Sequence, residues 1–447
     1  MTAQRVQAAP AAARAWWVAA VAGLTIVAAG AFTTVPGLLV DPLNRDFGWS
    51  RSSISVAVAV NMVLYGVTAP FAAALMDRFG IRRVVTAALA LIALGAGLTT
   101  MMTAAWQLTL YWGLLVGLGC GSLTMTFAVT VTNAWFVKRR GLVTGALTGA
   151  SHLGQLAFLP VLAWVVQNKG WRLAPIVLCL AAAVVVVLVW LLLRDHPADL
   201  GRKPYGAEEF TPKPPPAQDS AGRAITVLGR SARGGRFWLI AATFAICGAS
   251  TNGIMWSHFA PAAHDHGMPM TIAAGLLTAI GVCSATGTVI SGWLTDRVDA
   301  RLLLVGYYAL RAVTLFLLPS ILAPTVAPSM VVWVVVYGLI DVATVPPTIH
   351  ICRKLYGDDS PVVFGWVNAA HQLGAGAMAL VAGMLRDSLG SYDAMGYSAA
   401  VLCVGAAGIA LTLAPGEHAR ERPPTDGSAV QQADEGSGTR SADKLKA

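Results

Sequence analysis

Long runs of apolar residues fill most of this chain, and short polar or basic segments separate them. Twelve of these runs are long enough to cross about 30 Å of hydrocarbon as helices. Both faces of each run are apolar, unlike the surface helices of soluble proteins. Strand edges would leave backbone groups unpaired in lipid, so helices are the expected structure. The predicted spans are residues 16–40, 52–75, 84–104, 106–134, 142–166, 172–193, 237–261, 271–294, 302–322, 328–350, 361–385 and 393–414.

Two short loops between these runs are near copies of each other. Asp77 and Asp296 occupy the same place in the two loops and lie 219 positions apart (296 − 77). An apolar chain that repeats at half its length is typical of a transporter made of two halves. The matching loop residues are Asp77, Arg78, Gly80 and Arg82 in the first copy, and Gly292, Asp296, Arg297 and Arg301 in the second.

The composition also favours a membrane protein. Of the 447 residues, 56% are hydrophobic and only 12% are charged. A water-soluble protein this apolar would expose large patches and aggregate. The net charge of +9 would suit nucleic acid, but the basic residues lie in loops and tails. We therefore expect a lipid bilayer as the surroundings of the chain, and no nucleic acid as a partner.

The lysine and arginine residues predict how the chain is oriented. With both termini inside, the inner segments carry 25 of the 31 basic residues, the outer loops carry 5, and Arg311 lies within a run. Such an asymmetry places the basic loops in the cytoplasm. We therefore expect a multi-pass protein of the inner (plasma) membrane with both termini cytoplasmic. The first apolar run is too long for a signal peptide and should remain as an uncleaved span.

These features predict an all-α membrane protein with twelve transmembrane helices in two pseudo-symmetric six-helix bundles. The segment between the bundles is rich in proline and charge, so we expect a flexible linker. The C-terminal segment is polar and is expected to be disordered. The predicted organisation is a cytoplasmic tail (1–15), an N-terminal bundle (16–193), a cytoplasmic linker (194–236), a C-terminal bundle (237–414) and a second cytoplasmic tail (415–447).

The repeated loops resemble those of the major facilitator superfamily. In that family a loop of the pattern Gly-x-x-x-Asp-Arg-x-Gly-x-Arg joins the second and third helices of each half. Here Ala73 stands at the first glycine of the first copy, and Asp299 stands at the second glycine of the other. Residues 46–51 and 193–201 resemble the monocarboxylate and oxalate–formate branch. The resemblance implies two six-helix bundles that rock around a central site.

One position departs from that branch. Its members often carry an arginine in the eighth helix, four residues before the glycine of the second loop, and this arginine would hold a substrate carboxylate. Thr288 stands at that position in this chain. A neutral hydroxyl does not replace a guanidinium group that pairs with both oxygens of a carboxylate. The resemblance therefore supports a transporter but weakens the expectation of a monocarboxylate.

Two permanent or titratable charges fall well inside the predicted spans. Arg311 lies halfway along span 302–322, and Asp341 lies halfway along span 328–350. Charges within the bilayer are costly and therefore suggest function. One interpretation is a structural ion pair between neighbouring helices, and the other makes Asp341 a proton site. The resemblance places the tenth span beside the central cavity, which favours Asp341 as the functional residue of the two.

Two histidines extend the internal repeat. His152 and His371 are 219 positions apart (371 − 152), and Gln155 and Gln372 lie close to them. Both histidines should therefore approach the pseudo-twofold axis between the halves. They are interpreted either as hydrogen-bonding groups between helices or as groups that carry a proton near neutral pH.

Several weaker polar positions complete the candidate pathway. Each of these residues either forms hydrogen bonds between helices or contacts the solute; they are Asn61, Tyr65, Asn252, Tyr337 and Asn368. His264 and His266 flank an aspartate, but two histidines in a short loop are a weak metal pattern, and we expect no metal. The six cysteines have no metal-site spacing and are interpreted as small core residues.

The glycines are not followed by the Gly-Lys-Ser/Thr of a P-loop, so ATP is not expected as the energy source. No nucleophile–base pair suggests an enzyme, and no cofactor is expected. We predict a monomeric secondary transporter of a small organic solute, with a carboxylate and a coupled proton as the first candidate. The alternative is a proton-driven exporter of neutral or amphipathic drug-like compounds. A transport-inactive membrane sensor is a third hypothesis.

Overall fold

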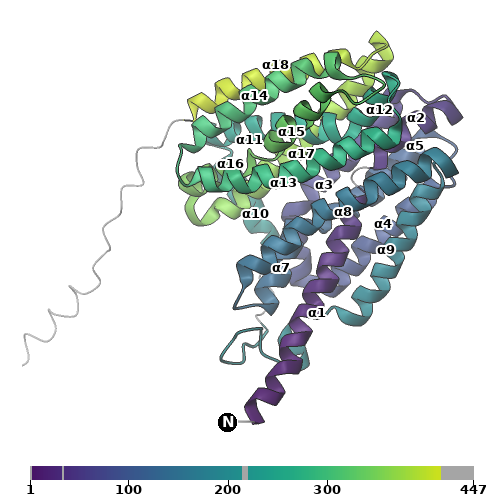
Figure 1. Cartoon of the computed structure of the whole chain (residues 1–447). Coiled ribbons are helices and arrows are strands. Elements are labelled where there is room, and N and C mark those ends of the chain that lie inside the picture. The colour runs from purple at the N-terminus through teal and green to yellow at the C-terminus, as the bar shows by residue number, and fades with distance from the viewer. Residues whose placement is uncertain (1–2, 33–34, 214–219, 414–447) are drawn as a thin grey trace, which may run out of the picture. The chain divides into compact units, whose positions relative to one another are not determined.

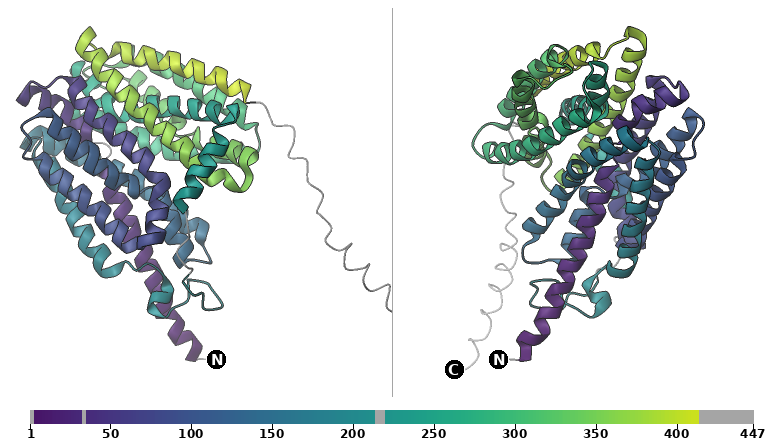
Figure 2. Two further views of the ribbon diagram at one scale, coloured as in Figure 1. Left: turned by 180° about the vertical axis from the view of Figure 1, so that it is seen from behind. Right: turned by 45° about the vertical axis from the view of Figure 1, so that its right-hand side comes forward.

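Helices make up almost all of the structure, as expected for a chain that must satisfy its backbone groups within lipid. The computed structural model describes residues 3–32, 35–213 and 220–413. Figure 1 shows the course of the chain, and Figure 2 shows it from two further sides. The described part contains no β-strand, only an isolated bridge between Phe136 and Tyr205. The predicted tail 415–447 lies outside the described residues.

The N-terminal helices, which we call the N half, correspond to the first six predicted spans. Glycine-rich or π-helical stretches interrupt some of these spans, so that one span consists of several helical elements. These elements are α1 (Ala3–Ala31), α2 (Val35–Phe47), α3 (Arg51–Phe79), α4 (Ile81–Thr99), α5 (Ala105–Leu108), η1 (Thr109–Val116), α6 (Gly117–Ser122), α7 (Met125–Trp135), α8 (Arg140–Lys169) and α9 (Leu173–Leu192).

The C-terminal helices, which we call the C half, correspond to the last six predicted spans. Two short helices precede them, η2 (Pro197–Leu200) and α10 (Ser220–Ser231). The elements of the C half are α11 (Gly235–Gly248), η3 (Ala249–Trp256), α12 (Ser257–Asp265), α13 (Met270–Thr295), α14 (Ala300–Ile321), α15 (Pro328–Asp341), α16 (Val345–Tyr356), η4 (Gly357–Asp359), α17 (Ser360–Leu389) and α18 (Asp393–Thr412).

The offset of 219 residues relates the helices of the two halves as well as the loops. Subtracting 219 from the bounds of α13 gives 51–76, and α3 begins at Arg51. The same subtraction places α14 on 81–102 and α17 on 141–170, where α4 and α8 begin within one residue. Even the interruption after Asp341 has its counterpart after Ser122. The internal repeat therefore describes the whole of both halves.

Ten helical stretches are long and apolar enough to cross a membrane, counted over the described residues. The stretch over α9 has a mean hydropathy of 3.0, yet only 28% of its most apolar window is buried within the protein. Such an exposed apolar surface suits contact with lipid. α8 and α17 are not among the ten, and α17 is interrupted by the polar residues Asn368, His371 and Gln372.

Two pairs of helices join the halves, and the internal repeat relates one pair to the other. α3 packs beside α17, and α8 packs beside α13. The first contact is close, because a Cβ atom on Gly376 of α17 would lie 2.9 Å from the carbonyl oxygen of Ala59. Within the N half, Gly113, Gly117 and Gly121 pack against α3 as a row of small residues should. On α8, by contrast, no atom lies within 4 Å of a Cβ atom placed on Gly149, so this glycine is not part of a close helix contact.

Part of the segment predicted as a flexible linker is a packed helix. α10 lies against α3 and α17, and its Arg223 and Arg230 pair with Asp359 at 3.4 and 3.1 Å. The indole nitrogen of Trp366 donates to the carbonyl of Ala224 at 3.0 Å. The proline-rich composition hid this amphipathic helix, whose apolar side covers the ends of the neighbouring helices.

Candidate functional site

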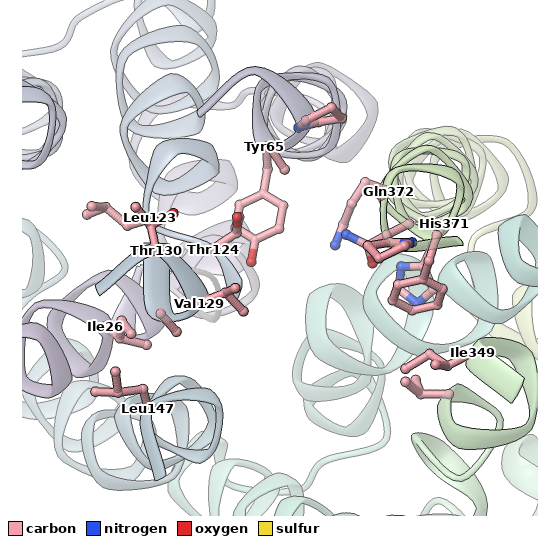
Figure 3. Close-up of a pocket in the computed structure, with 18 of the residues that line it drawn as sticks. Ile26, Tyr65, Leu123, Thr124, Val129, Thr130, Leu147, Ile349, His371 and Gln372 are labelled. Atoms are coloured by element: carbon pink, nitrogen blue, oxygen red, sulfur yellow. The ribbon is translucent and has the colours of Figure 1, made fainter. Parts of the chain in front are cut away.

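A cavity of about 2520 Å³ lies between the two halves. Figure 3 shows its central part, with Tyr65 on one wall and His371 and Gln372 on the facing wall. The two walls come from α3 in the N half and α17 in the C half. Both halves therefore supply groups to one central site, as the internal repeat predicts.

The cavity reaches the repeated loops at one end of the molecule. Asp77, Arg78, Asp296 and Arg353 line this part of it, and Arg223 of α10 lies there too. We call this the open end. At the opposite end the lining stops before the junctions of α2 with α3 and of α12 with α13. We call that end the closed end.

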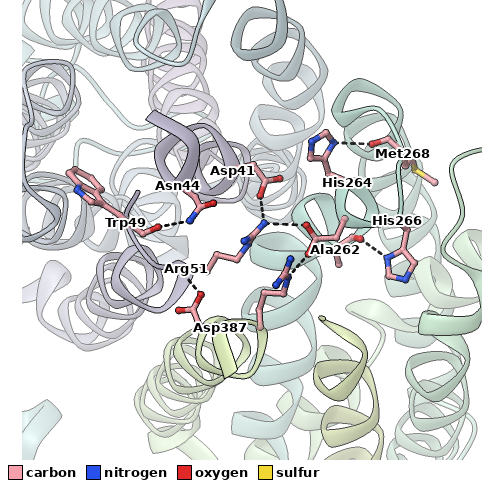
Figure 4. Close-up of polar contacts among 11 residues, drawn as sticks. Asp41, Asn44, Trp49, Arg51, Ala262, His264, His266, Met268 and Asp387 are labelled. Carbon is pink, nitrogen blue, oxygen red and sulfur yellow. Dashed lines mark hydrogen bonds and ion pairs between the residues drawn. The ribbon is translucent and has the colours of Figure 1, made fainter. Parts of the chain in front are cut away.

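Ion pairs join the two halves at the closed end, as Figure 4 shows. Arg51, at the start of α3, pairs with Asp41 at 2.9 Å and with Asp265 of the C half at 3.1 Å. Asp265 also accepts a hydrogen bond from Arg386 of α17 at 2.5 Å. Since these side chains are largely shielded from water, the network holds the halves together more firmly than surface pairs would.

The first turn of α3 makes a second contact between the halves. The backbone amides of Arg51 and Ser52 donate to the carboxylate of Asp387 at 3.1 and 2.8 Å. A carboxylate at a helix N-terminus satisfies free amides and complements the helix dipole. These two amides are protected only while the closed end stays closed, because Asp387 belongs to the other half.

Arg311 of α14 is fully buried and is held by acceptors of the protein itself. Its Nη1 atom lies 3.1 Å from the Ser250 hydroxyl and 3.3 Å from the Cys247 sulfur. Its Nη2 atom donates to the backbone carbonyls of Ile340, at 2.8 Å, and of Asp341. The guanidinium group therefore bonds the backbone of Asp341 rather than its carboxylate, so the predicted side-chain ion pair is not formed.

Asp341, at the end of α15, is buried and lines the cavity. Neither of its carboxylate oxygens has a hydrogen-bond partner. A charged carboxylate without partners is costly in a buried site, so a proton or another donor is needed to stabilise it. Of the two predicted charges, Asp341 is the one that lines the cavity, and Arg311 lies behind it.

The other predicted polar residues divide between the cavity and the helix contacts. Tyr337 donates to the carbonyl of Ser250 at 3.1 Å and does not line the cavity, but its side chain interacts with that of Asp341. Asn61 lines the cavity and also donates to the carbonyl of Trp112 at 2.9 Å. The other predicted polar residues that line the cavity are Tyr65, Gln155, Asn252, Asn368, His371 and Gln372.

Of the two histidines that the repeat relates, only His371 has a described side chain. His371 is buried at the cavity wall, and its Nδ1 atom has no hydrogen-bond partner. Beside it, Asn252 donates to Gln372 at 3.4 Å. The side chain of His152 lies outside the described residues, so its approach to His371 stays a prediction.

The repeated loops lie at the open end. The cavity lining includes Asp77, Arg78, Gly80 and Arg82 of the first copy, and Gly292 and Asp296 of the second. Arg297 and Arg301 are not part of it. Arg297 instead stacks on Trp293 at 4.1 Å and donates to the carbonyl of the same residue at 2.9 Å.

The helices that follow the two repeated loops begin in different ways. Gly80 has φ +88°, a conformation that favours glycine. Asp195, from beyond α9, accepts from the backbone amide of Arg82 at 2.7 Å. In the second copy Asp299 caps α14 itself, by accepting from the amide of Arg301 at 2.9 Å. The Arg301 guanidinium, hydrogen-bonded to Asp299, lowers the pKa of that carboxyl below its ordinary value of 3.8.

Two features were missed by the sequence analysis. Cys247 was interpreted as a core residue, yet it lies at the cavity wall with its sulfur 3.1 Å from the Thr344 hydroxyl. The network of Arg51 with Asp265 was missed because the two residues are 214 positions apart. No spacing in the sequence connects them, although the charged residues near span ends were a usable signal.

Comparison with known proteins agrees with this arrangement. A family model described as the Major Facilitator Superfamily matches residues 21–284 and 246–441. The chain belongs to the major facilitator superfamily. It is a multi-pass membrane transporter for a small solute, and it is not an enzyme.

Several of the named relatives are monocarboxylate transporters. The chain is 31% identical to monocarboxylate transporter 13 of Bos taurus over 369 residues, which covers 81% of this chain and 80% of the relative. It is 28% identical to monocarboxylate transporter 11 of Mus musculus, over 80% of this chain and 78% of the relative. The sequence resemblance to the superfamily and to its monocarboxylate branch is thereby confirmed.

Solved structures confirm the fold. A bacterial homologue of the lysosomal transporter Spinster, described as inward-facing and unoccupied, superposes with a TM-score of 0.68 at 15% identity. The match covers 90% of this chain and 97% of that one. A D-xylose–proton symporter gives a TM-score of 0.65 at 17% identity, over 87% of this chain and 97% of that one. At these identities the likeness concerns the fold alone.

Proposed function

We propose that this superfamily member moves a small organic solute by alternating access and that Asp341 carries a coupled proton. The open end is assigned to the cytoplasm, because the basic loops and the packed helix α10 lie there. The inward-facing description of the Spinster homologue supports this assignment. The structure then represents the inward-facing state, with the pairs around Arg51 closing the outer side.

The observation that carries the proposal is the unpartnered carboxylate of Asp341 on the cavity wall. Protonation removes the charge that has no hydrogen-bond partner, and it leaves the buried guanidinium of Arg311, which donates to the backbone carbonyl of Asp341, as a positive charge beside this group. The site then favours an anion over a cation. Proton binding and anion binding would therefore support each other, as a coupled transporter requires.

The solute class has two candidates. The names of the relatives support a carboxylate, and the charge argument above agrees with them. Thr288 supports a neutral or amphipathic solute instead, because its hydroxyl donates to the carbonyl of Ser284 at 2.8 Å and supplies no cation. Arg311 does not replace the missing arginine directly, since its Nη atoms already bond four groups of the protein.

The test is transport by purified protein in proteoliposomes, with organic acids and uncharged compounds compared as solutes. For one coupled proton, a gradient of one pH unit drives about tenfold accumulation, since 1.36 kcal/mol corresponds to a factor of ten. Asp341→Asn should still exchange solute between the two sides but lose this accumulation. The variant should fold, because Arg311 retains its backbone acceptors.

Two further variants sharpen this test. The double variant Asp341→Asn with Arg311→Gln should stay uncoupled; recovery of coupling would show that the two residues form only a structural pair. Ser122→Ala, at the position of the N half that corresponds to Asp341 (341 − 219), should accumulate solute normally. Gradient-driven accumulation by Asp341→Asn would refute the proton role, and absence of any exchange by the wild-type protein would favour a sensor.

A further inference from the structure

A cluster of buried titratable residues lies at the closed end, apart from the cavity that contains Asp341. His258 of α12 is 1% exposed, and Tyr392, before α18, is 2% exposed. Their rings are 5.5 Å apart. The guanidinium of Arg51 lies 6.0 Å from the centre of the Tyr392 ring. The cluster therefore sits directly behind the ion pairs that join the two halves.

The hydrogen bond of His258 determines which ring nitrogen holds its proton. The Nε2 atom lies 2.8 Å from the backbone carbonyl of Ala379 on α17. A carbonyl oxygen only accepts, so Nε2 donates and carries the hydrogen. In the neutral ring the Nδ1 atom is then a bare acceptor, and it has no partner. His258 is therefore a buried base with an unused site for a second proton.

Three other buried polar atoms of this end are also without partners. They are the hydroxyl of Tyr392, the second carboxylate oxygen of Asp41 and the Nε atom of Arg51. Buried polar groups are normally satisfied, so several exceptions in one place indicate a site with a ligand or an alternative arrangement. In this case the smallest ligand that fits an acceptor such as Nδ1 is a proton, delivered by water.

The charges around His258 decide what that proton would do. The groups at this end are Asp41 on α2, Arg51 at the start of α3, His264 and Asp265 on α12, His266 just after it, Arg386 and Asp387 on α17, Tyr392, and Asp393 at the start of α18, which lies 3.7 Å from His266. η3 and α13 contribute no charged side chain, and the one titratable residue on them is Cys283.

Apart from Asp393, the acids in this group are already engaged by Arg51, Arg386 and the α3 amides. An imidazolium at His258 would add a second buried cation beside Arg51 with no partner for its new N–H group.

We infer that His258 is a second proton-binding site and that its protonation opens the closed end of the transporter. In the closed arrangement the added charge lies buried next to Arg51, whereas opening exposes the ring to water. The proton therefore binds the open arrangement better, and a ligand that prefers one state shifts the population toward it. With the orientation proposed above, external acid would favour the outward-facing state.

The experiment measures hydrogen–deuterium exchange in the purified full-length protein without any solute. The reporters are the amides of Arg51 and Ser52, which donate to Asp387 only while the end is closed. Exchange is compared at about pH 7.5 and about pH 5.5, on either side of the ordinary pKa of ~6.5 for histidine. After correction for intrinsic exchange rates, the wild-type protein should exchange these amides about tenfold faster at the lower pH, a preference of about 1.36 kcal/mol.

Matched variants separate His258 from the other groups. His258→Gln keeps a donor for the Ala379 carbonyl but never becomes charged, so it should lose the response. A second uncharged variant, His258→Asn, should lose it as well. His264→Gln and His266→Gln, at the other two histidines of this end, should respond like the wild type. Asp341→Asn should also respond, because this readout does not depend on the coupled proton of the central site.

Three results would overturn the inference. The first is a wild-type protein whose reporter amides exchange equally at both pH values, and the second is slower exchange at the lower pH. The third is a full response in a folded His258→Gln or His258→Asn variant. Loss of the response in Asp341→Asn alone would assign the pH effect to the central site instead.

Discussion

The two halves of this transporter share one helical plan but differ in what they bury. Arg311, Asp341 and Cys247 form a polar cluster in the C half. The positions 219 residues earlier are Ile92, Ser122 and Ala28. Ile92 is completely buried and packs in the apolar core of the N half. The same place in the same fold therefore accepts either an isoleucine or an arginine.

This difference shows that the charged cluster is not needed to build a six-helix half. The N half forms the same helices with uncharged side chains at these positions, which avoids the desolvation of charges. A cluster that the fold does not require, and that costs free energy in a bilayer, indicates a role in transport. Among the described side chains, the buried charged groups of this cluster therefore belong to the C half.

The largest expected effect comes from replacing Arg311 alone in the buried cluster of the C half. Arg311→Gln should lower the free energy of unfolding by about 2–6 kcal/mol, because it leaves the buried carbonyls of Ile340 and Asp341 without this donor, at about 1–3 kcal/mol each. The matched change in the N half, Ile92→Val, should cost about 0.5–1.5 kcal/mol. Thermal unfolding of both variants in detergent measures the difference.

A double variant provides the control for that prediction. Arg311→Ile with Asp341→Ser copies the residues of the N half into the C half. Because isoleucine supplies no donor for the carbonyls of Ile340 and Asp341, this protein should still unfold below the wild-type temperature, and it should lose accumulation driven by a pH gradient. A double variant that remains coupled, or an Arg311→Gln variant as stable as Ile92→Val, would contradict the functional asymmetry of the halves.

An intermediate effect is expected at the repeated loops, where the halves are most alike. Asp77 and Asp296 lie at the open end, each beside an arginine. We predict that both fasten helix ends in one state of the transport cycle. Asp77→Asn and Asp296→Asn should each slow solute exchange by about two- to fivefold, the equivalent of about 0.3–1 kcal/mol for a charge at a helix end. Initial rates in proteoliposomes, normalised to inserted protein, test this; wild-type rates in both variants would disprove it.

The smallest effect concerns the start of the helix after each loop. Asp299 caps α14 with its own side chain, whereas its counterpart Gly80 (299 − 219) has no side chain to do so. Asp299→Ala should cost about 1 kcal/mol of stability, and Asp299→Asn should cost little, because asparagine also caps helices.

The contribution of Asp299 to the stability of the folded protein depends on pH in a definite direction. Because the folded-state pKa of Asp299 is lowered, its contribution is present above the ordinary value of 3.8 and is lost as the pH falls through the folded value. Acid titration of the unfolding temperature for wild type and Asp299→Asn compares the two. An Asp299→Asn variant with the same acid dependence as the wild type would show that another carboxylate is responsible.

Much of this architecture was predictable from the sequence. The apolar runs predicted the helices because lipid leaves the backbone few other ways to satisfy its hydrogen bonds. The offset between Asp77 and Asp296 predicted a repeat that extends to whole helices such as α13 and α3. Asp341 was also recognisable, because a charge within a long apolar run is conspicuous whatever the tertiary structure.

The tertiary structure alone decided which polar groups meet. Arg311 and Asp341 both interrupted apolar spans, yet only the packing of α14 against α15 and η3 shows that both Nη atoms of Arg311 have partners and that the Asp341 carboxylate oxygens have none. Arg51 and Asp265, or His258 and Ala379, lie more than a hundred positions apart in the sequence. Hydrophobicity along the chain is a local property and predicts spans, but hydrogen bonds between helices depend on rotation and crossing, which long-range packing sets.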